Sequence, residues 1–152
     1  MHRTWGVSES RCTLHCGRIR GQLAVFDWES AELSGFPALD LIYFLTYWSF
    51  YREGAMRAGG YRPFYLDAFR RCLDPGSRTG AVCQECLTRY AEAMGLPRRA
   101  IGPLRLLAWM LHGRSAWQRM REEREAIPEP EELRRHVFWN LWREQLRDLS
   151  NA

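Results

Sequence analysis

The chain has no lysine, and all 22 of its basic residues are arginine. A genome rich in guanine and cytosine, of a bacterial type, accounts for such a bias. Because lysine is absent, no catalytic or binding role that needs a lysine side chain can be assigned to this chain. The basic residues are scattered, and the densest region, residues 114–124, is interleaved with Glu122 and Glu123, as on a solvated helix face. We therefore expect no nucleic-acid partner, despite a net charge of +4.

Long apolar runs are also missing. No window of about eighteen residues is apolar and uncharged throughout, so we expect no membrane span and no membrane partner. The first residues, MHRTWGVSESRC, lack the apolar centre and the small-residue cleavage site of a secretory signal. These absences favour a cytoplasmic location. With 152 residues, of which 46% are hydrophobic, the chain is long enough for one domain with a core.

The chain has five cysteines, an odd number. An odd count without an export signal argues against a disulfide framework. Cys83 and Cys86 have the spacing of a metal or redox pair, and Cys12, His15 and Cys16 form a second group of potential ligands. Together the two groups could hold zinc. Because Cys83 and Cys86 fall within a helical pattern, where small buried thiols pack well, we expect packing residues and no zinc.

The chain begins with a β-type pattern. Thr13–His15 and Gln22–Phe26 are short runs of this kind, separated by Gly17–Gly21, and this spacing predicts a hairpin over about residues 12–27. After Pro37 the apolar residues recur at helical spacing instead. We therefore expect a mainly α fold with a small β remnant, forming one domain over residues 1–152.

About five helices are expected in the helical part, which covers about residues 38–150. Apolar periodicity, prolines and glycines place four of them at about residues 38–54, 63–73, 79–94 and 131–149, and the fourth in chain order within residues 95–125. Gly95 should cap the third of these helices, and Pro103 suits the first turn of the fourth. In the second helix, Phe64, Ala68 and Cys72 form the predicted buried stripe.

The segment from Gln22 to Leu45, QLAVFDWESAELSGFPALDLIYFL, has an unusual order of features. A hydrophobic strand ends in Asp27, a loop of small residues follows, and Asp40 opens an aromatic-rich helix. This order resembles the C-terminal lobe of the aminoglycoside phosphotransferase and choline kinase-like family, which has a protein-kinase-like fold. The resemblance is specific over this segment and general afterwards.

The resemblance implies roles for the two acids. Asp27 would hold the magnesium that bridges the phosphates of ATP, since magnesium takes hard oxygen ligands. Asp40 would be a structural brace for the catalytic loop. Each acid also has a simpler interpretation: Asp27 as a strand-end acid facing water, and Asp40 as a residue that favours a helix N-terminus.

The catalytic-loop motif of that family is not found. The family pattern is His-Gly-Asp, with Asn five residues after the Asp, and the nearest segment here is Trp5-Gly6-Val7, with Cys12 at the Asn position. Only Gly6 matches. Val7 cannot accept a proton from a substrate hydroxyl, and Cys12 is a poor magnesium ligand. We therefore assign no catalytic residue.

A nucleotide-binding lobe with its phosphate-pairing lysine is also not found, so we assign no cofactor-binding residue. Arginine is not a simple replacement at such a site, because its geometry and bulk differ from those of lysine. The chain thus resembles the truncated C-terminal part of an ATP-dependent phosphotransferase that acts on a small-molecule hydroxyl. We expect it to be inactive alone and to bind neither Mg²⁺ nor ATP tightly. A remnant gene, a shifted reading frame and a misplaced start remain alternative origins.

A second hypothesis is a non-catalytic helical module that binds a ligand or a partner, and a third is a zinc-stabilised helical domain. The seven tryptophans, six tyrosines and seven phenylalanines suit either a sugar- or choline-type pocket or an ordinary core. If the lobe is incomplete, some of Trp48, Phe50, Trp109 and Trp117 should be uncovered. Such an apolar patch would favour self-association.

Overall fold

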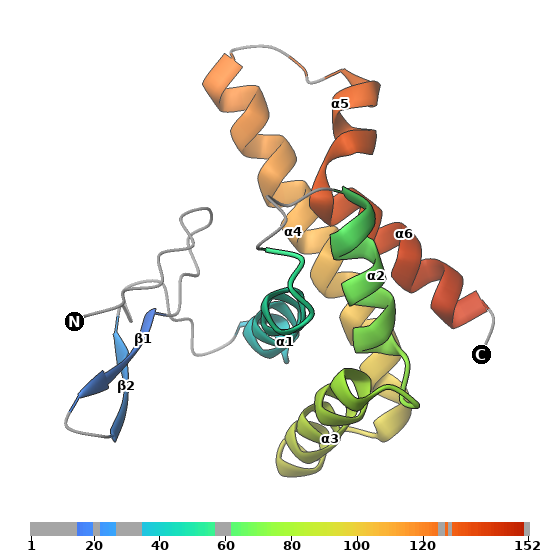
Figure 1. The fold of residues 1–152 in the computed structure, drawn as a ribbon. Helices are drawn as coiled ribbons and strands as arrows, with labels where there is room; N and C mark the ends of the chain where they lie inside the picture. The colour runs from blue at the N-terminus through green and yellow to red at the C-terminus, as the bar shows by residue number, and fades with distance from the viewer. Residues whose placement is uncertain are drawn as a thin grey trace. The chain divides into compact units, whose positions relative to one another are not determined.

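The computed structural model describes residues 15–19, 22–26, 35–56, 62–124, 127 and 129–150 (Figure 1). The chain divides into two compact units, Met1–Phe36 and Pro37–Ala152. The boundary falls in the loop between the predicted hairpin and the predicted helical part. No helix among the described residues combines the length and the apolar character needed to cross a membrane.

In the first unit, β1 (His15–Ile19) pairs with β2 (Gln22–Phe26) in antiparallel register. His15 lies opposite Phe26, and Ile19 lies opposite Gln22. Strand β1 therefore includes residues 17–19, which the sequence pattern assigned to the connection. The register leaves only two residues between the strands, the length of the commonest hairpin connection.

The second unit is helical, which confirms the mainly α class. Its described part contains six α-helices and a short 3₁₀ turn: α1 (Leu39–Arg52), α2 (Arg62–Leu73), α3 (Arg78–Ala93), η2 (Arg98–Ala100), α4 (Ile101–Arg124), α5 (Pro130–Arg135) and α6 (Val137–Ser150). The longest helix, α4, packs most extensively against α6 (Figure 1).

Local signals fix most helix ends. The Ser77 hydroxyl accepts a hydrogen bond from the Gly80 N–H and caps the start of α3. Gly95 follows the end of α3 with φ 65°, which confirms its predicted role, since glycine adopts this conformation without strain. The start of α1 is different. Ala38 has φ 62° and no capping side chain, and its N–H donates to the Tyr90 hydroxyl of α3.

The prediction of one helix over residues 131–149 is wrong, because the helix is interrupted at His136, between α5 and α6. His136 has extended backbone angles, φ −67° and ψ 139°. Its ring Nδ1 accepts a hydrogen bond from the Phe138 N–H at 3.3 Å, so the side chain caps the first turn of α6. This cap stabilises the interruption of the helix, and α5 runs in a different direction from α6 (Figure 1).

The core of the second unit is formed by α1, α2, α3, α4 and α6. Its largest fully buried side chains are Trp109, Phe50, Phe69 and Leu141. The predicted stripe on α2 is partly wrong, because Phe64 is 53% exposed. Positions 65, 68, 69 and 72 are buried instead, and this spacing describes one continuous helix face.

Candidate small-molecule pocket

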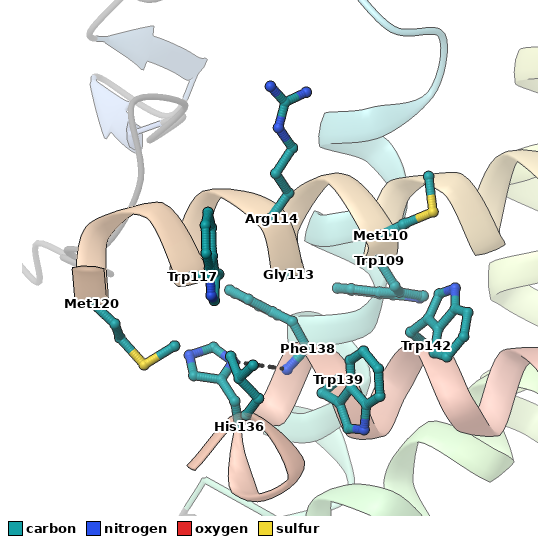
Figure 2. Close-up of a pocket in the computed structure, with 11 residues that line it drawn as sticks. Trp109, Met110, Gly113, Arg114, Trp117, Met120, His136, Phe138, Trp139 and Trp142 are labelled. Carbon is teal, nitrogen blue, oxygen red and sulfur yellow. Dashed lines mark hydrogen bonds between the residues drawn. The ribbon is translucent and has the colours of Figure 1, made fainter. Parts of the chain in front are cut away.

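A cavity of about 340 Å³ lies between α4, α5 and α6 (Figure 2). Its lining is mostly aromatic and aliphatic, with two methionines and few polar groups. The lining residues are Trp109, Met110, Gly113, Arg114, Trp117, Met120, Leu133, His136, Phe138, Trp139 and Trp142.

Helix α4 supplies one wall. Trp109, Gly113, Trp117 and Met120 recur at intervals of four, four and three residues, so they share one face of the helix. Gly113 leaves a gap between the two tryptophans, because a Cβ placed there would meet nothing within 4 Å. The cavity therefore exists partly because a small residue interrupts a row of large ones.

The opposite wall comes from the start of α6 and from α5. Phe138, Trp139 and Trp142 lie in the first turns of α6, and Leu133 belongs to α5. His136 stands at the break between the two helices, and Figure 2 shows its bond to the Phe138 backbone. The interruption of the helix at His136, which the sequence pattern did not predict, thus places α5 at the edge of the cavity.

Ring contacts hold these walls in place. Trp109 stacks on Phe138 with centroids 6.2 Å apart and an interplanar angle of 20°. Trp139 and Trp142 lie 5.2 Å apart, and the Arg121 guanidinium lies 5.1 Å from the centroid of the Trp117 ring. Aromatic and cation–π pairs of this kind add to the stability that burial gives. The pocket is therefore preformed.

Two indole N–H groups near the cavity lack a hydrogen-bond partner within the described part of the chain. They are Nε1 of Trp109 and Nε1 of Trp142, and both atoms are buried. Trp109 as a whole is 0% exposed. An indole nitrogen is a donor only, so each group can be satisfied only by an acceptor.

The charge around the cavity is low. Among the described residues, no Asp or Glu lines it, and Arg114 is the single arginine in the lining. Arg114 is exposed and extends from the side of α4 away from the rings (Figure 2). Behind the wall, His112 contacts the rings of Trp109 and Phe138. Burial, aided by Arg119, lowers the pKa of His112 to about 4, so its ring is neutral at neutral pH.

Of the two acids predicted from the sequence, Asp40 is not among the residues that line this cavity. Asp27 lies outside the described residues, as do Gly6, Val7 and Cys12. Asp40 is in the first turn of α1, as predicted, and is exposed. The helix-capping position itself belongs to Ala38. The role of Asp40 as a brace, and that of Asp27 as a metal ligand, stay predictions.

Cys83 and Cys86 lie in one helix, α3, as predicted. Cys83 is fully buried, and its sulfur is 3.3 Å from that of Cys72 on α2, with both thiols free. The contact with Cys72, together with burial, raises the pKa of the Cys83 thiol. In the parts of the chain that the structure describes, no three His, Cys, Asp or Glu side chains cluster to hold a metal. The side chains of Cys12, His15 and Cys16 fall outside those parts.

The aromatic content of the sequence predicts a pocket or a core without assigning particular residues to either. Trp109 and Trp117 are predicted only as members of an uncovered patch, and the rings of α6 are not part of that prediction. The WNLW sequence at residues 139–142 was the available signal, since it places two tryptophans nearly one turn apart. Phe50 and Trp109 are buried, so neither can belong to an exposed patch.

Comparisons of the chain with protein-family models, with curated proteins and with solved structures found no match.

Proposed function

We propose that this chain is a non-catalytic helical module that binds a small molecule in the α4–α5–α6 pocket. The observation that carries the proposal is the cavity itself. Its volume of about 340 Å³ lies within the range of small-molecule sites, which is roughly 300–1,000 Å³. Its lining is also typical of such sites, which are mainly apolar and aromatic with a few polar groups.

We also propose a common origin with the C-terminal lobe of the phosphotransferase-like family. The segment QLAVFDWESAELSGFPALDL supports this origin, with Asp27 after β2 and Asp40 at the start of α1. On this proposal, the hairpin and the helical unit derive from parts of one lobe. The pocket would then be a ligand site kept after phosphoryl transfer was lost, with Mg²⁺ and ATP no longer bound.

A fluorescent probe tests the binding function directly. N-phenyl-1-naphthylamine is neutral and emits strongly in apolar surroundings, and we expect saturable binding with one probe per chain. In Gly113→Leu, the new side chain extends from the pocket wall into the cavity. We expect this variant to bind the probe at least about tenfold more weakly. Its thermal stability should not fall, since leucine favours helix and fills space.

Val82→Leu is the matched control, because Val82 is an exposed residue of α3 that does not line the pocket. This variant should bind the probe as the wild type does. Absence of saturable binding by the wild type, or equal binding by a folded Gly113→Leu, would reject the proposed function.

A further inference from the structure

We propose that Cys72 and Cys83 form a redox-active pair that closes to a disulfide, and that Cys86 connects this pair to small disulfides in solution. The site is the corner between α2 and α3, and its chemistry does not depend on ligand binding in the pocket. The proposal rests on the distance between two buried sulfurs, on the way the two helices are held together, and on the exposure of the third thiol.

The two buried sulfurs lie close to bonding distance. Cys72 is near the end of α2 and Cys83 is in the second turn of α3, and their Sγ atoms are 3.3 Å apart. Both thiols are free. A disulfide bond is about 2.05 Å long, so the sulfurs need to approach each other by only about 1.3 Å. The bond therefore requires a small local movement.

The connection between α2 and α3 holds the two cysteines opposite each other. Only residues 74–77 separate the helices (Figure 1). The Ser77 hydroxyl donates to the Arg71 carbonyl oxygen and accepts from the Gly80 N–H, so it ties the end of α2 to the start of α3. Because Gly80 has no side chain, the two backbones also approach closely at this point. The corner is therefore preorganised for a disulfide that closes a short loop.

The surroundings of the pair favour a thiolate at one of the two sulfurs. The contact with Cys83 lowers the pKa of the Cys72 thiol and outweighs the opposite effect of burial. The positive charge of the buried Arg105 and the hydroxyls of Ser49 and Thr46 lower this pKa further. The thiolate is the reactive form of cysteine, so Cys72 is the nucleophile of the pair.

The oxidant reaches the pair through a third thiol. Cys83 is fully buried and Cys72 is only 3% exposed, so a dissolved oxidant does not contact either sulfur directly. Cys86 lies three residues after Cys83 on α3 and is half-buried. Side chains three positions apart are neighbours on a helix surface, so Cys86 can pass oxidation inward by thiol–disulfide exchange.

Each exchange step conserves atoms and electrons. The Cys86 thiolate attacks a small disulfide, RSSR, which leaves a mixed disulfide on Cys86 and releases RS⁻. Cys83 displaces the second RS⁻ and forms a bond to Cys86, while its proton passes to the Cys72 thiolate 3.3 Å away. Cys72 then displaces Cys86 from Cys83, and its proton goes to the Cys86 sulfur. In total, Cys72 and Cys83 lose two electrons and two protons, and RSSR becomes two RSH.

Oxidised glutathione serves as the small disulfide in the test, which uses the full chain. Trypsin cleaves after arginine, and this places Cys72 on the peptide 72–78 and Cys83 on the peptide 79–89. We expect mass spectrometry to find these two peptides joined after oxidation and separate after treatment with dithiothreitol. The melting temperature of the oxidised chain should be roughly 5–10 °C higher, since a disulfide that closes a loop of about ten residues restricts the unfolded chain.

Three variants separate the roles of the thiols. Cys83→Ala and Cys72→Ala should each give no joined peptides and no rise in melting temperature. Cys86→Ser should reach the same joined product at least about tenfold more slowly, because the oxidant then enters only through local opening of the fold. The product of this variant also identifies Cys83 as the bonded residue, since the peptide 79–89 then contains no other cysteine.

Cys72 and Cys83 thiols that stay free after prolonged oxidation of the folded wild type would overturn the redox pair. So would a final product in which Cys83 is bonded to Cys86. Equal oxidation rates of the wild type and Cys86→Ser would overturn the role of Cys86 as the entry thiol. Peptide mapping of the wild type requires no variant, so it decides even if Cys83→Ala or Cys72→Ala does not fold.

Discussion

Gly80 is the described glycine at which an added Cβ would make the shortest contact. A Cβ at this position would lie 1.9 Å from the Asp74 carbonyl oxygen and 2.6 Å from that of Arg71. The Gly80 N–H also donates to the Ser77 hydroxyl that caps α3. Only glycine therefore lets the start of α3 approach the end of α2.

Gly80→Ala should destabilise the protein by about 3 kcal/mol, at the upper end of the cost of overpacking, because backbone must move to admit the methyl group. Gly113→Ala is the control, since it adds the same methyl group inside α4, where nothing lies within 4 Å. Replacing a helix glycine by alanine should stabilise the protein by about 0.5–1 kcal/mol. Urea denaturation of both variants measures the difference, and equal stabilities would refute this account of Gly80.

His112 is a buried titratable residue behind the pocket wall. Its ring packs on Tyr43, Trp109 and Phe138, with centroid distances of 4.7, 5.8 and 5.2 Å. Its pKa of about 4 lies below the ordinary value of 6.5, so between these two values the unfolded chain binds more protons than the folded one. Stability should therefore fall as the pH falls from 6.5 to 4.

The predicted contribution of His112 to this loss is about 3 kcal/mol, from a shift of about 2.5 units at 1.36 kcal/mol per unit. His112→Phe keeps the ring stack and removes the titration. The stability difference between wild type and His112→Phe should be constant above pH 7 and should change steadily between pH 6.5 and 4. Denaturation curves over this range provide the measurement. Parallel pH profiles would contradict the buried, neutral histidine.

At the level of elements, the sequence predicted helices best where local signals determine them. Gly95 and the prolines act within one turn, so the predicted ends of α2 and α3 lie within one residue of the observed ones. The break at His136 could not be predicted, because residues 131–149 contain no glycine or proline. That break depends on a ring nitrogen reaching the Phe138 N–H, and on which side of α6 faces α4. The exposed position of Phe64 has the same origin, since the rotation of α2 is set by tertiary packing.

The contact between α2 and α6 includes a polar connection through Glu144. Its carboxylate accepts hydrogen bonds from Arg70 at 2.9 Å and from Arg147 at 2.5 Å, and its side chain is only 11% exposed. Burial raises the pKa of Glu144, but the two arginines more than offset this and hold it below its usual range. The ionised Glu144 carboxylate therefore stabilises the folded protein above about pH 4.3, and this contribution is lost as the pH falls.

Glu144→Gln should destabilise the protein by about 1 kcal/mol at pH 7, a value reduced from that of a buried charged pair because Arg70 is half exposed. Glu85→Gln is the control, because Glu85 is 59% exposed and pairs with Arg89 on the same helix. Its effect should stay within about 0.5 kcal/mol. The difference between the variants, measured by thermal denaturation, should shrink at pH 3. A larger effect at Glu85 would show that the connection between α2 and α6 contributes little.

For the whole molecule, features that depend on short-range sequence signals were predictable, whereas the packing of one helix face on another was not. The strand, loop and acid pattern around Asp27 is local, so one sequence is enough to suggest a family origin. The pocket is not local, because its walls come from α4 and from α5 and α6, across the chain reversal after residue 124. Aromatic content predicted a pocket or a core without assigning residues to it. It could not show which rings of α4 and α6 would meet, because that depends on how two helix faces pack.

Ligand binding and phosphoryl transfer require different residues of the chain. The described residues that line the pocket all belong to the helical unit, whereas phosphoryl transfer requires a base and a group that pairs with phosphates. On the family resemblance, Val7 and Cys12 would occupy the catalytic-loop positions, and the chain has no lysine. Loss of a general base alone lowers a rate by about 100- to 10,000-fold, and poor positioning of the reactants lowers it further. A single carboxylate such as Asp27 would also hold a hydrated magnesium ion only weakly.

We therefore predict no detectable ATP-dependent phosphorylation of aminoglycosides, choline or simple sugars by this chain, and no ATP affinity in the micromolar range. Calorimetric titration with magnesium-ATP and a coupled turnover assay provide the measurements, with N-phenyl-1-naphthylamine binding as the control that the same preparation is folded. Asp27→Ala should leave probe binding and the absence of turnover unchanged. Turnover by the wild type that disappears in Asp27→Ala would show that Asp27 supports phosphoryl transfer. In that case the pocket would have to be reconsidered as the site of the hydroxyl acceptor.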